Sequence, residues 1–331
     1  MKYFRILIFL LTAVSLNSYP VKKYDFHRPE FSPSPITAGL GGHNVTYFAD
    51  PYAAFNNPAL VCFVKKSKFS VSMRSGENSE IDFDKIISSE TLFKKSKLAG
   101  IVFSGEKFAL SYIPLADISR QLSDSLGTHK YLDYALNSLN LTIGETKGKK
   151  NWGFTVKGLW GRSVFLDYVS GSSLNFKDDK YMGFSTDFGF AFKDESVTYG
   201  FSAYDIFGRI YRKHSSDKNP IPRYSLGTGY SFNNSVFSLS WLGKISSFKL
   251  KDNTFHGGYS FLFPDINIWS YSGKALFRFG IYGSKFKRAK DTFLTFGAGF
   301  YMKAFRIDLS LTNNDLTAKN NRYLISVSAG I

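Results

Sequence analysis

Most of the sequence consists of segments in which large apolar residues alternate one by one with small or polar residues. In residues 304–311, AFRIDLSL, phenylalanine, isoleucine and leucine alternate with Arg306, Asp308 and Ser310. Successive side chains of a β-strand point to opposite faces, so each such segment predicts a strand with one apolar face and one small or polar face. A chain built in this way is restricted to an all-β fold.

About fourteen such segments follow one another from residue 68 onward. We place them at residues 68–75, 97–104, 106–114, 131–145, 151–165, 181–193, 196–206, 221–232, 234–244, 253–263, 274–283, 292–302, 304–313 and 322–331. Most contain about nine to thirteen residues, the length that a tilted strand needs to cross the hydrocarbon layer of a membrane. An even number of strands is typical of bacterial outer-membrane barrels.

Short and long connections alternate between these segments, as they do in an outer-membrane barrel. Tight turns are predicted at Gly105-Glu106, Asp194-Glu195, Asn233-Asn234 and Lys303-Ala304. Long polar connections are predicted at residues 76–96, 115–130, 170–180, 208–220, 245–252, 284–291 and 314–321. The tenth connection, residues 264–273, is longer than a short turn, unless its INIWSY sequence extends a neighbouring strand.

The composition indicates which face of these strands meets the surroundings. The chain has 34 phenylalanines, 20 tyrosines and 28 glycines, yet its mean hydropathy is only -0.15. Aromatic residues and leucine dominate one face and glycine and serine the other, which favours a closed antiparallel transmembrane β-barrel of about fourteen strands. We expect Trp152, Trp160, Trp241 and Tyr301 in the interfacial girdles. The alternative is a secreted soluble β-protein with the apolar faces packed between two sheets.

The N-terminus predicts export. Lys2 and Arg5 precede an apolar run, and Ala13 and Ser15 supply the small residues of a cleavage site, so residues 1–15 are interpreted as a signal peptide. The formal net charge of +16 indicates an acidic partner. Because export separates the chain from nucleic acid, anionic lipid or acidic polysaccharide is the expected partner. An equally good interpretation is that the lysines only decorate loops. The predicted location is the outer membrane, with its lipid as one partner.

Nothing in the sequence points to catalysis or to a cofactor. Cys62 is the single cysteine, and the five histidines show no metal-ligand spacing, so no metal site is expected. His256 and Ser260 share a strand face, but four residues along a strand separate them by roughly 13 Å, too far for a Ser-His pair. We therefore expect a protein that is not an enzyme.

Residues 16–67 precede the first strand and break the alternation. Gly41-Gly42 and Asp50-Pro51 are turn signals, and the residue before a proline is biased away from helix, which applies to Asn57. We expect residues 16–67 to form a periplasmic leader and a compact segment that folds into the lumen as a hatch. Residues 68–331 are then the barrel.

Several motifs resemble a known family. GLGGHNV at residue 39, Asp50 and FNNPAL at residue 55 resemble the N-terminal hatch of the FadL-like outer-membrane barrels, most closely the PorV/PorQ branch. FHGGYSF, ALFRFGIYGS and FLTFGAGFYMKAFRIDLSL near the C-terminus are similar too. The resemblance implies a fourteen-stranded barrel with an occupied lumen. It assigns to the hatch or gating motif Gly41, Gly42, Asp50, Asn56, Asn57, Pro58 and Ala59.

The resemblance implies two alternative functions. PorV/PorQ proteins are associated with type IX secretion, which implies a scaffold or docking component in protein export or surface attachment, with secretion-system or surface proteins as partners. FadL-like transporters imply instead a gated channel for long-chain fatty acids or other hydrophobic small molecules, with Phe48 and Phe55 lining a tunnel past Pro58. The longest predicted loop has about twenty residues, which is short for collecting an amphipathic ligand and favours the scaffold.

The alternation also places charged residues on the small or polar face of the strands. They are Asp187, Arg278, Arg306 and Asp308. In a barrel this face is the lumen, so these charges line a pore or hold the hatch. The other interpretation is that they form ordinary salt bridges of a barrel interior.

Overall fold

The computed structural model describes residues 32–75, 96–123, 128–169, 175–214, 219–246, 249–268, 271–284, 292–302, 304–313 and 322–330. Its strands are β1 Lys68–Ser75, β2 Ser96–Gly105, β3 Phe108–Ser123, β4 Thr128–Lys147, β5 Lys150–Val169, β6 Asn175–Asp194, β7 Val197–Arg212, β8 Arg223–Phe232, β9 Ser235–Ser246, β10 Lys249–Ile268, β11 Tyr271–Gly283, β12 Thr292–Tyr301, β13 Phe305–Asn313 and β14 Arg322–Gly330. Each predicted segment corresponds to one of these strands.

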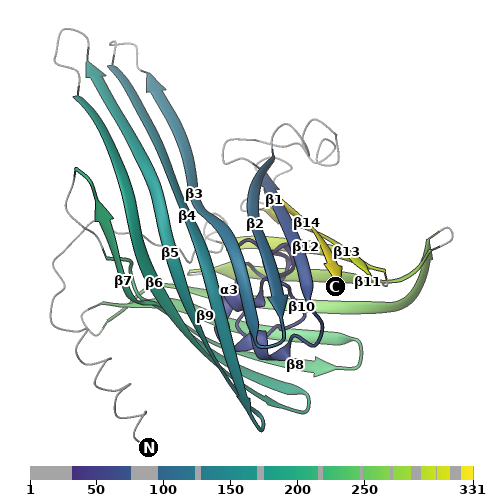
Figure 1. Ribbon diagram of the computed structural model, residues 1–331. Helices are drawn as coiled ribbons and strands as arrows, with labels where there is room; N and C mark the ends of the chain where they lie inside the picture. The colour runs from purple at the N-terminus through teal and green to yellow at the C-terminus, as the bar shows by residue number, and fades with distance from the viewer. Residues whose placement is uncertain are drawn as a thin grey trace, which may run out of the picture.

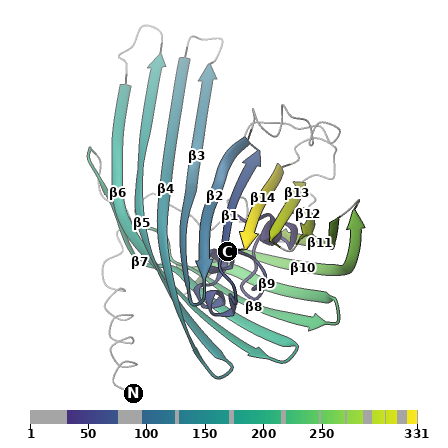
Figure 2. The ribbon, with the colours of Figure 1, turned by 45° about the vertical axis from the view of Figure 1, so that its right-hand side comes forward.

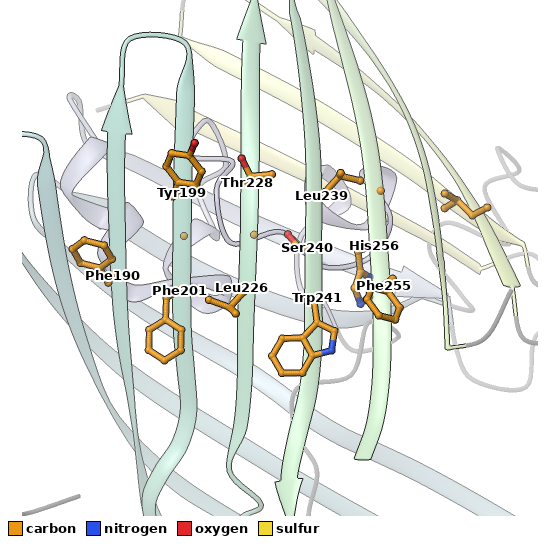
Figure 3. Close-up of a pocket in the computed structure, with 14 residues that line it drawn as sticks. Phe190, Tyr199, Phe201, Leu226, Thr228, Leu239, Ser240, Trp241, Phe255 and His256 are labelled. Carbon is orange, nitrogen blue, oxygen red and sulfur yellow. The ribbon is translucent and has the colours of Figure 1, made fainter. Parts of the chain in front are cut away.

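The strands form a closed antiparallel barrel (Figures 1 and 2). Each strand pairs with its neighbour in sequence, and β1 pairs with β14 from Lys68↔Gly330 to Arg74↔Leu324. Closure removes the free sheet edges that would otherwise expose unpaired backbone groups, a condition for any β-structure in lipid. The predicted fold class is confirmed.

The barrel is apolar outside and polar inside, the reverse of a soluble protein. On β4 the exposed residues Leu139, Leu141 and Ile143 alternate with Asn140 and Thr142, which are 4% and 3% exposed. The same division recurs around the barrel, with phenylalanines outside and serines inside. Water would penalise such an exterior, whereas lipid tails match it. The alternative of two stacked sheets with the aromatic residues between them is wrong.

Short turns lie at one end and most of the longer connections at the other, as predicted. The exception is the predicted long connection at residues 245–252, which is short, because β9 ends at Ser246 and β10 begins at Lys249. Glu106 and Lys107 join β2 to β3, and Asn233 and Asn234 join β8 to β9. The tenth connection is also short, because β10 continues to Ile268 and β11 already begins at Tyr271. In an outer-membrane barrel the end with the short turns faces the periplasm.

Several strands are longer than predicted. Residues expected in loops at 115–130 and 170–180 belong largely to β3 to β6, whereas β7 takes only the first part of 208–220, up to Arg212. Strands β4, β5 and β6 each contain 20 residues, about 66 Å of extended chain. These hairpins rise well beyond the other strands (Figures 1 and 2). Beyond the membrane both faces of a strand meet water, so the alternation fades while backbone pairing continues, as it does from Lys147↔Lys150 to Thr128↔Val169.

The predicted aromatic girdle is correct only in part. Trp152 and Trp160 are exposed on the outer face, at 42% and 39%. Tyr301 instead lies beside Arg278 and Arg306, with the Arg306 guanidinium 4.1 Å from its ring centre. Its position places it on the luminal face with Thr295, because both have odd numbers on the same regular strand.

Within residues 32–67, three short helices precede β1 and lie inside the barrel (Figures 1 and 2). They are α2 Pro35–Gly39, α3 Ala53–Asn56 and the 3-10 helix η3 Pro58–Phe63. Among the described residues, no helix has the length and hydropathy needed to cross a membrane. The predicted signal peptide, residues 1–15, lies outside the described residues.

The outward apolar face can be tested at Leu239 on β9, which is 64% exposed. We expect Leu239→Arg to lower the free energy of unfolding in a lipid bilayer by roughly 2–4 kcal/mol, because a cation is unfavourable on the lipid face of a barrel. Urea unfolding in phospholipid vesicles, followed by tryptophan fluorescence, measures this change. Leu239→Phe is the control and should stay within about 0.5 kcal/mol of wild type. Equal stability of the arginine variant would contradict a lipid-facing position.

Candidate functional site: the luminal segment and a gap in the barrel wall

Residues 32–64, here called the luminal segment, occupy the barrel interior. The segment spans the lumen, since α2 contacts β11 to β14 while η3 contacts β3 to β6 on the other side. Most of its residues are buried, including Ile36, Leu40 and Leu60 at 1% exposure or less. The fold therefore brings the residues of the predicted hatch motif into contact with the wall.

A cluster of buried polar side chains joins the two halves of the luminal segment. The Asp50 carboxylate accepts hydrogen bonds from Ser34 Oγ at 2.5 Å, Thr37 Oγ1 at 2.8 Å and the Tyr52 backbone N–H at 2.8 Å. Ser34 also caps the N-terminus of α2, and the Asn56 amide donates to Thr37 Oγ1 at 3.0 Å. Burial raises the pKa of Asp50, while the hydrogen bonds from Ser34 and Thr37 oppose this shift. Asp50 and Asn56 thus hold α2 against α3.

Asn57 connects the luminal segment to itself and to the wall. Its Oδ1 accepts from the Ala59 backbone N–H at 3.0 Å and caps η3, with Pro58 at the first helical position. Its Nδ2 donates to the backbone carbonyls of Val45 at 2.9 Å and Phe190 at 3.1 Å. All of its amide atoms are therefore paired at a site with no solvent access.

Gly41 and Gly42 end helix α2. Their φ angles of +89° and +81° lie in the left-handed region, which glycine adopts without strain. The Gly42 N–H donates to the Thr37 and Ala38 carbonyls, and the Gly41 N–H donates to Thr295 Oγ1 of β12 at 3.1 Å. The pair of glycines turns the chain and joins it to the wall at the same point.

Glycines of the wall let the luminal segment lie directly against the strands. A methyl group at Gly153 would come within 2.1 Å of the Pro58 carbonyl carbon, and one at Gly200 within 2.2 Å of the Val45 carbonyl oxygen. Other wall glycines that approach the segment this closely are Gly144, Gly189, Gly258 and Gly280. Because the backbones are in contact, the segment fits against the wall only if these wall positions have no side chain.

Two histidines lie at the same interface. His43 Nε2 is 2.9 Å from Ser225 Oγ, and His256 Nδ1 donates to the Gly41 carbonyl at 2.6 Å. Burial lowers the pKa of His43 well below its usual range, so its ring is neutral. His256 therefore bonds to the luminal segment and is not paired with Ser260. Among the described residues no cluster of His, Cys, Asp and Glu could hold a metal ion.

The predicted luminal charges lie inside, in two ion clusters. Asp308 pairs with Arg278 at 2.8 Å and with Arg306, and all three are buried. Arg306 Nη1 also donates to the Ala49 carbonyl of the luminal segment at 2.6 Å. This cluster therefore combines interior salt bridges with a direct bond to the segment.

The second ion cluster contains two residues that sequence analysis missed. Lys157 Nζ lies 2.7 Å from Asp187 and 2.9 Å from Asp205. Lys157 lies at an inward-facing position of the alternating pattern, so the sequence was sufficient to predict its place in the lumen. Asp205 has a φ of +52° within a bulge between β6 and β7, where the alternation is interrupted. The alternation of side chains therefore could not assign Asp205 to the inner face.

Backbone pairing between β2 and β3 stops part-way along the two strands, and this unpaired stretch is here called the gap. Among the described residues, these strands pair only from Gly105↔Phe108 to Ile101↔Tyr112, although β2 continues to Ser96 and β3 to Ser123. Pro114 lies just beyond the last pair and adjoins a register shift between β3 and β4. Proline has no N–H to donate, so it is found at edges and bulges of sheets. In Figures 1 and 2 the two strands separate above this point.

Tyr52 of the luminal segment bonds to the wall beside the gap. Its hydroxyl lies 3.0 Å from the Gly100 carbonyl of β2 and 3.1 Å from the Ser70 carbonyl of β1. Burial raises the pKa of Tyr52 to about 12, so the hydroxyl keeps the proton that it donates. The Gly100 carbonyl, on the strand whose pairing with β3 ends nearby, also accepts from Ser72 Oγ of β1 at 3.3 Å.

An apolar patch covers the inner wall next to the gap, where most of the lumen is polar. This inner apolar patch consists of Ile113, Leu115, Ala116, Leu136, Leu159, Tyr181 and Ile210, from β3 to β7. Phe55 of the luminal segment packs against it. Phe48 lies elsewhere, with its ring tilted against that of Phe63 at a centre-to-centre distance of 4.9 Å and with Lys193 over its ring. The two predicted tunnel residues therefore belong to separate apolar clusters.

Comparisons with known proteins identify the fold. No protein-family model and no curated protein matches the sequence. The toluene transporter TbuX of Ralstonia pickettii matches with a TM-score of 0.57 at 12% identity, over 90% of this chain and 98% of that one. The toluene transporter TodX of P. putida matches with 0.57 at 10% identity, over 94% and 99%. The deltaS2 mutant of TodX, a monoaromatic hydrocarbon channel, matches with 0.54 at 10% identity, over 92% and 100%.

These matches define a class of protein. The chain has the fold of the FadL-like outer-membrane barrels, as its motifs implied, and the matched proteins are transporters and channels. They give no support to the narrower assignment to the PorV/PorQ branch. At identities this low, the shared feature is the fold.

The Asn57 bonds predict how the luminal segment responds to mutation. We expect Asn57→Ala to weaken its attachment by about 1–3 kcal/mol, because buried groups at Val45, Ala59 and Phe190 lose their partners. Limited proteolysis after Lys65 and Lys66 and dye release from vesicles should both increase. Asn234→Ala, which removes an exposed amide from the turn between β8 and β9, is the control. Unchanged proteolysis and dye release in Asn57→Ala would count against this role.

The wall glycines predict a second effect. We expect Gly153→Ala to displace η3, because its methyl group would overlap the Pro58 backbone. Gly158→Ala, where the nearest atom is 3.9 Å away, is a matched control on the same strand. Labelling of Cys62 by a maleimide should be faster in Gly153→Ala than in the control, and equal rates would contradict the close contact.

Proposed function

We propose that this protein is a gated outer-membrane channel for hydrophobic small molecules, in which the luminal segment is the hatch. Residues 1–15 act as its signal peptide in this proposal, and residues 16–67 and 68–331 form the leader with hatch and the barrel. Asp187, Arg278, Arg306 and Asp308 hold the closed state through the ion clusters.

The observation that carries this proposal is the gap between β2 and β3 beside the inner apolar patch. Ile113 begins the patch at the point where β3 loses its pairing with β2. A hydrophobic molecule needs an apolar route through a lumen that is otherwise polar, and these residues offer one. Phe55 lies at the end of that route, so movement of the luminal segment would open it.

The tall hairpins of β3 to β6 remove the argument that favoured a scaffold. Short loops were expected to leave no extracellular structure for collecting a ligand, but the strands themselves extend beyond the membrane. The matched toluene transporters also support a channel more than a docking component in protein export or surface attachment. Uptake of a long-chain fatty acid and of an arene, measured separately, distinguishes the two ligand classes.

The test is uptake by cells whose outer membrane lacks other channels for hydrophobic compounds. Cells expressing this protein should take up radiolabelled palmitate or toluene faster than cells without it. We expect Phe55→Arg to reduce that uptake about tenfold, because a charge at the apolar patch is costly to pass. Phe232→Arg, at an exposed barrel rim, is the control and should be neutral.

A docking component gives a different result. It predicts no uptake above the level of cells without the protein, together with recovery of an exported protein after crosslinking. That pair of outcomes would reject the channel.

A further inference from the structure

A groove with aromatic and basic sides lies on the outer face of β5, β6 and β7, at the end with the long connections. It has a volume of about 630 Å³. Trp160, Met182 and Tyr211 form its apolar side and are 39%, 72% and 49% exposed. Pairing places these three residues in one row, because Trp160 pairs with Met182 and Met182 with Tyr211.

A row of cations, Arg162, Lys180 and Lys213, lies two residues further along the strands, away from the membrane centre. Arg162 pairs with Lys180, and the Lys213 N–H donates to the Lys180 carbonyl at 3.1 Å. Each cation is two residues from a member of the apolar row, so both rows lie on the same outer face. Neighbouring strands are about 4.8 Å apart, so the three positions span about 10 Å.

Carboxylates balance part of this charge. Asp178 accepts from Arg162 Nε at 2.8 Å and Nη2 at 2.7 Å, and Asp133 adds a second negative charge near Arg162. Lys180 and His214 are the other titratable groups near Asp178, so part of the Lys180 charge is also balanced. Arg162 is thus largely balanced, and Lys180 and Lys213 supply the excess positive charge.

The basic row is local to these strands. On β8, β9 and β10 the corresponding apolar row is Leu226, Trp241 and Phe255. The next outward positions there are Tyr224, Gly243 and Asn253, of which Asn253 accepts from Trp241 Nε1 at 3.2 Å. None of these three carries a cation, so the charge on β5 to β7 is not a general property of the rim.

We propose that this groove binds a phosphate-bearing lipid of the surrounding leaflet, with the phosphate at Lys180 and Lys213 and an acyl chain along Trp160, Met182 and Tyr211. An aromatic row with cations above it matches the boundary between lipid tails and anionic headgroups. A soluble anion would use the cations but not the apolar row. The proposed contacts come from outward-facing residues and do not depend on transport, and Tyr181 of the inner apolar patch lines the base of the groove.

The test uses the whole barrel purified in dodecyl maltoside and titrated with dioleoyl phosphatidic acid, with bound lipid counted by native mass spectrometry. We expect a one-to-one adduct that dioleoyl phosphatidylcholine does not form. Each lysine contributes roughly a factor of five near an anionic surface, so Lys180→Gln with Lys213→Gln should weaken the adduct about 25-fold. The control is Lys147→Gln with Lys150→Gln, a paired set of exposed lysines at the opposite end, which should leave the adduct intact.

Three results would overturn the proposal. One is equal loss in both double variants, and another is equal retention of the two lipids. The third is displacement of phosphatidic acid by millimolar inorganic phosphate, which would indicate an anion site without a lipid component. Met182→Gln gives a further check, because weaker binding of the lipid is expected although no charge changes.

Discussion

The structure depends on one constraint, that every backbone polar group in contact with lipid must be paired within the protein. Pairing of β1 with β14 meets this constraint for the ends of the sheet. Once the sheet is closed, its inner face is removed from lipid and can carry serine, buried ions and a segment of irregular chain. The short helices, which would be unfavourable against hydrocarbon, are enclosed by the same closure.

The gap between β2 and β3 departs from this rule, and its surroundings compensate. Pro114 removes a donor where β3 leaves β2, and the Tyr52 hydroxyl supplies a donor to the Gly100 carbonyl on the other side. The same carbonyl also accepts from Ser72 Oγ of β1, so the luminal segment supplies one of two side-chain donors at this point. The Tyr52 hydroxyl thus joins the luminal segment to β2 beside the gap.

Alternation of side chains made most of the barrel predictable. It located every strand and gave the first residue of β1, β12 and β14, because lipid selects the outer residues and the lumen selects the inner ones. It failed where that selection ends. The upper parts of β4 to β6 meet water on both faces, and the bulge at Asp205 breaks the period. Within the luminal segment, turn signals indicated Gly41, Gly42 and Asn57. Tyr52 had no signal, because its role comes from a distant strand.

The close contact between the wall glycines and the luminal segment also restricts how the protein can assemble. Gly153 and Gly200 leave no clearance for a side chain, so a finished cylinder offers no room through which the helices could be threaded afterwards. Such a fit is expected if the N-terminal helices and the wall fold together before the first and last strands meet. The narrow interior therefore favours an order of insertion in which the luminal segment takes its place first and β1 pairs with β14 last.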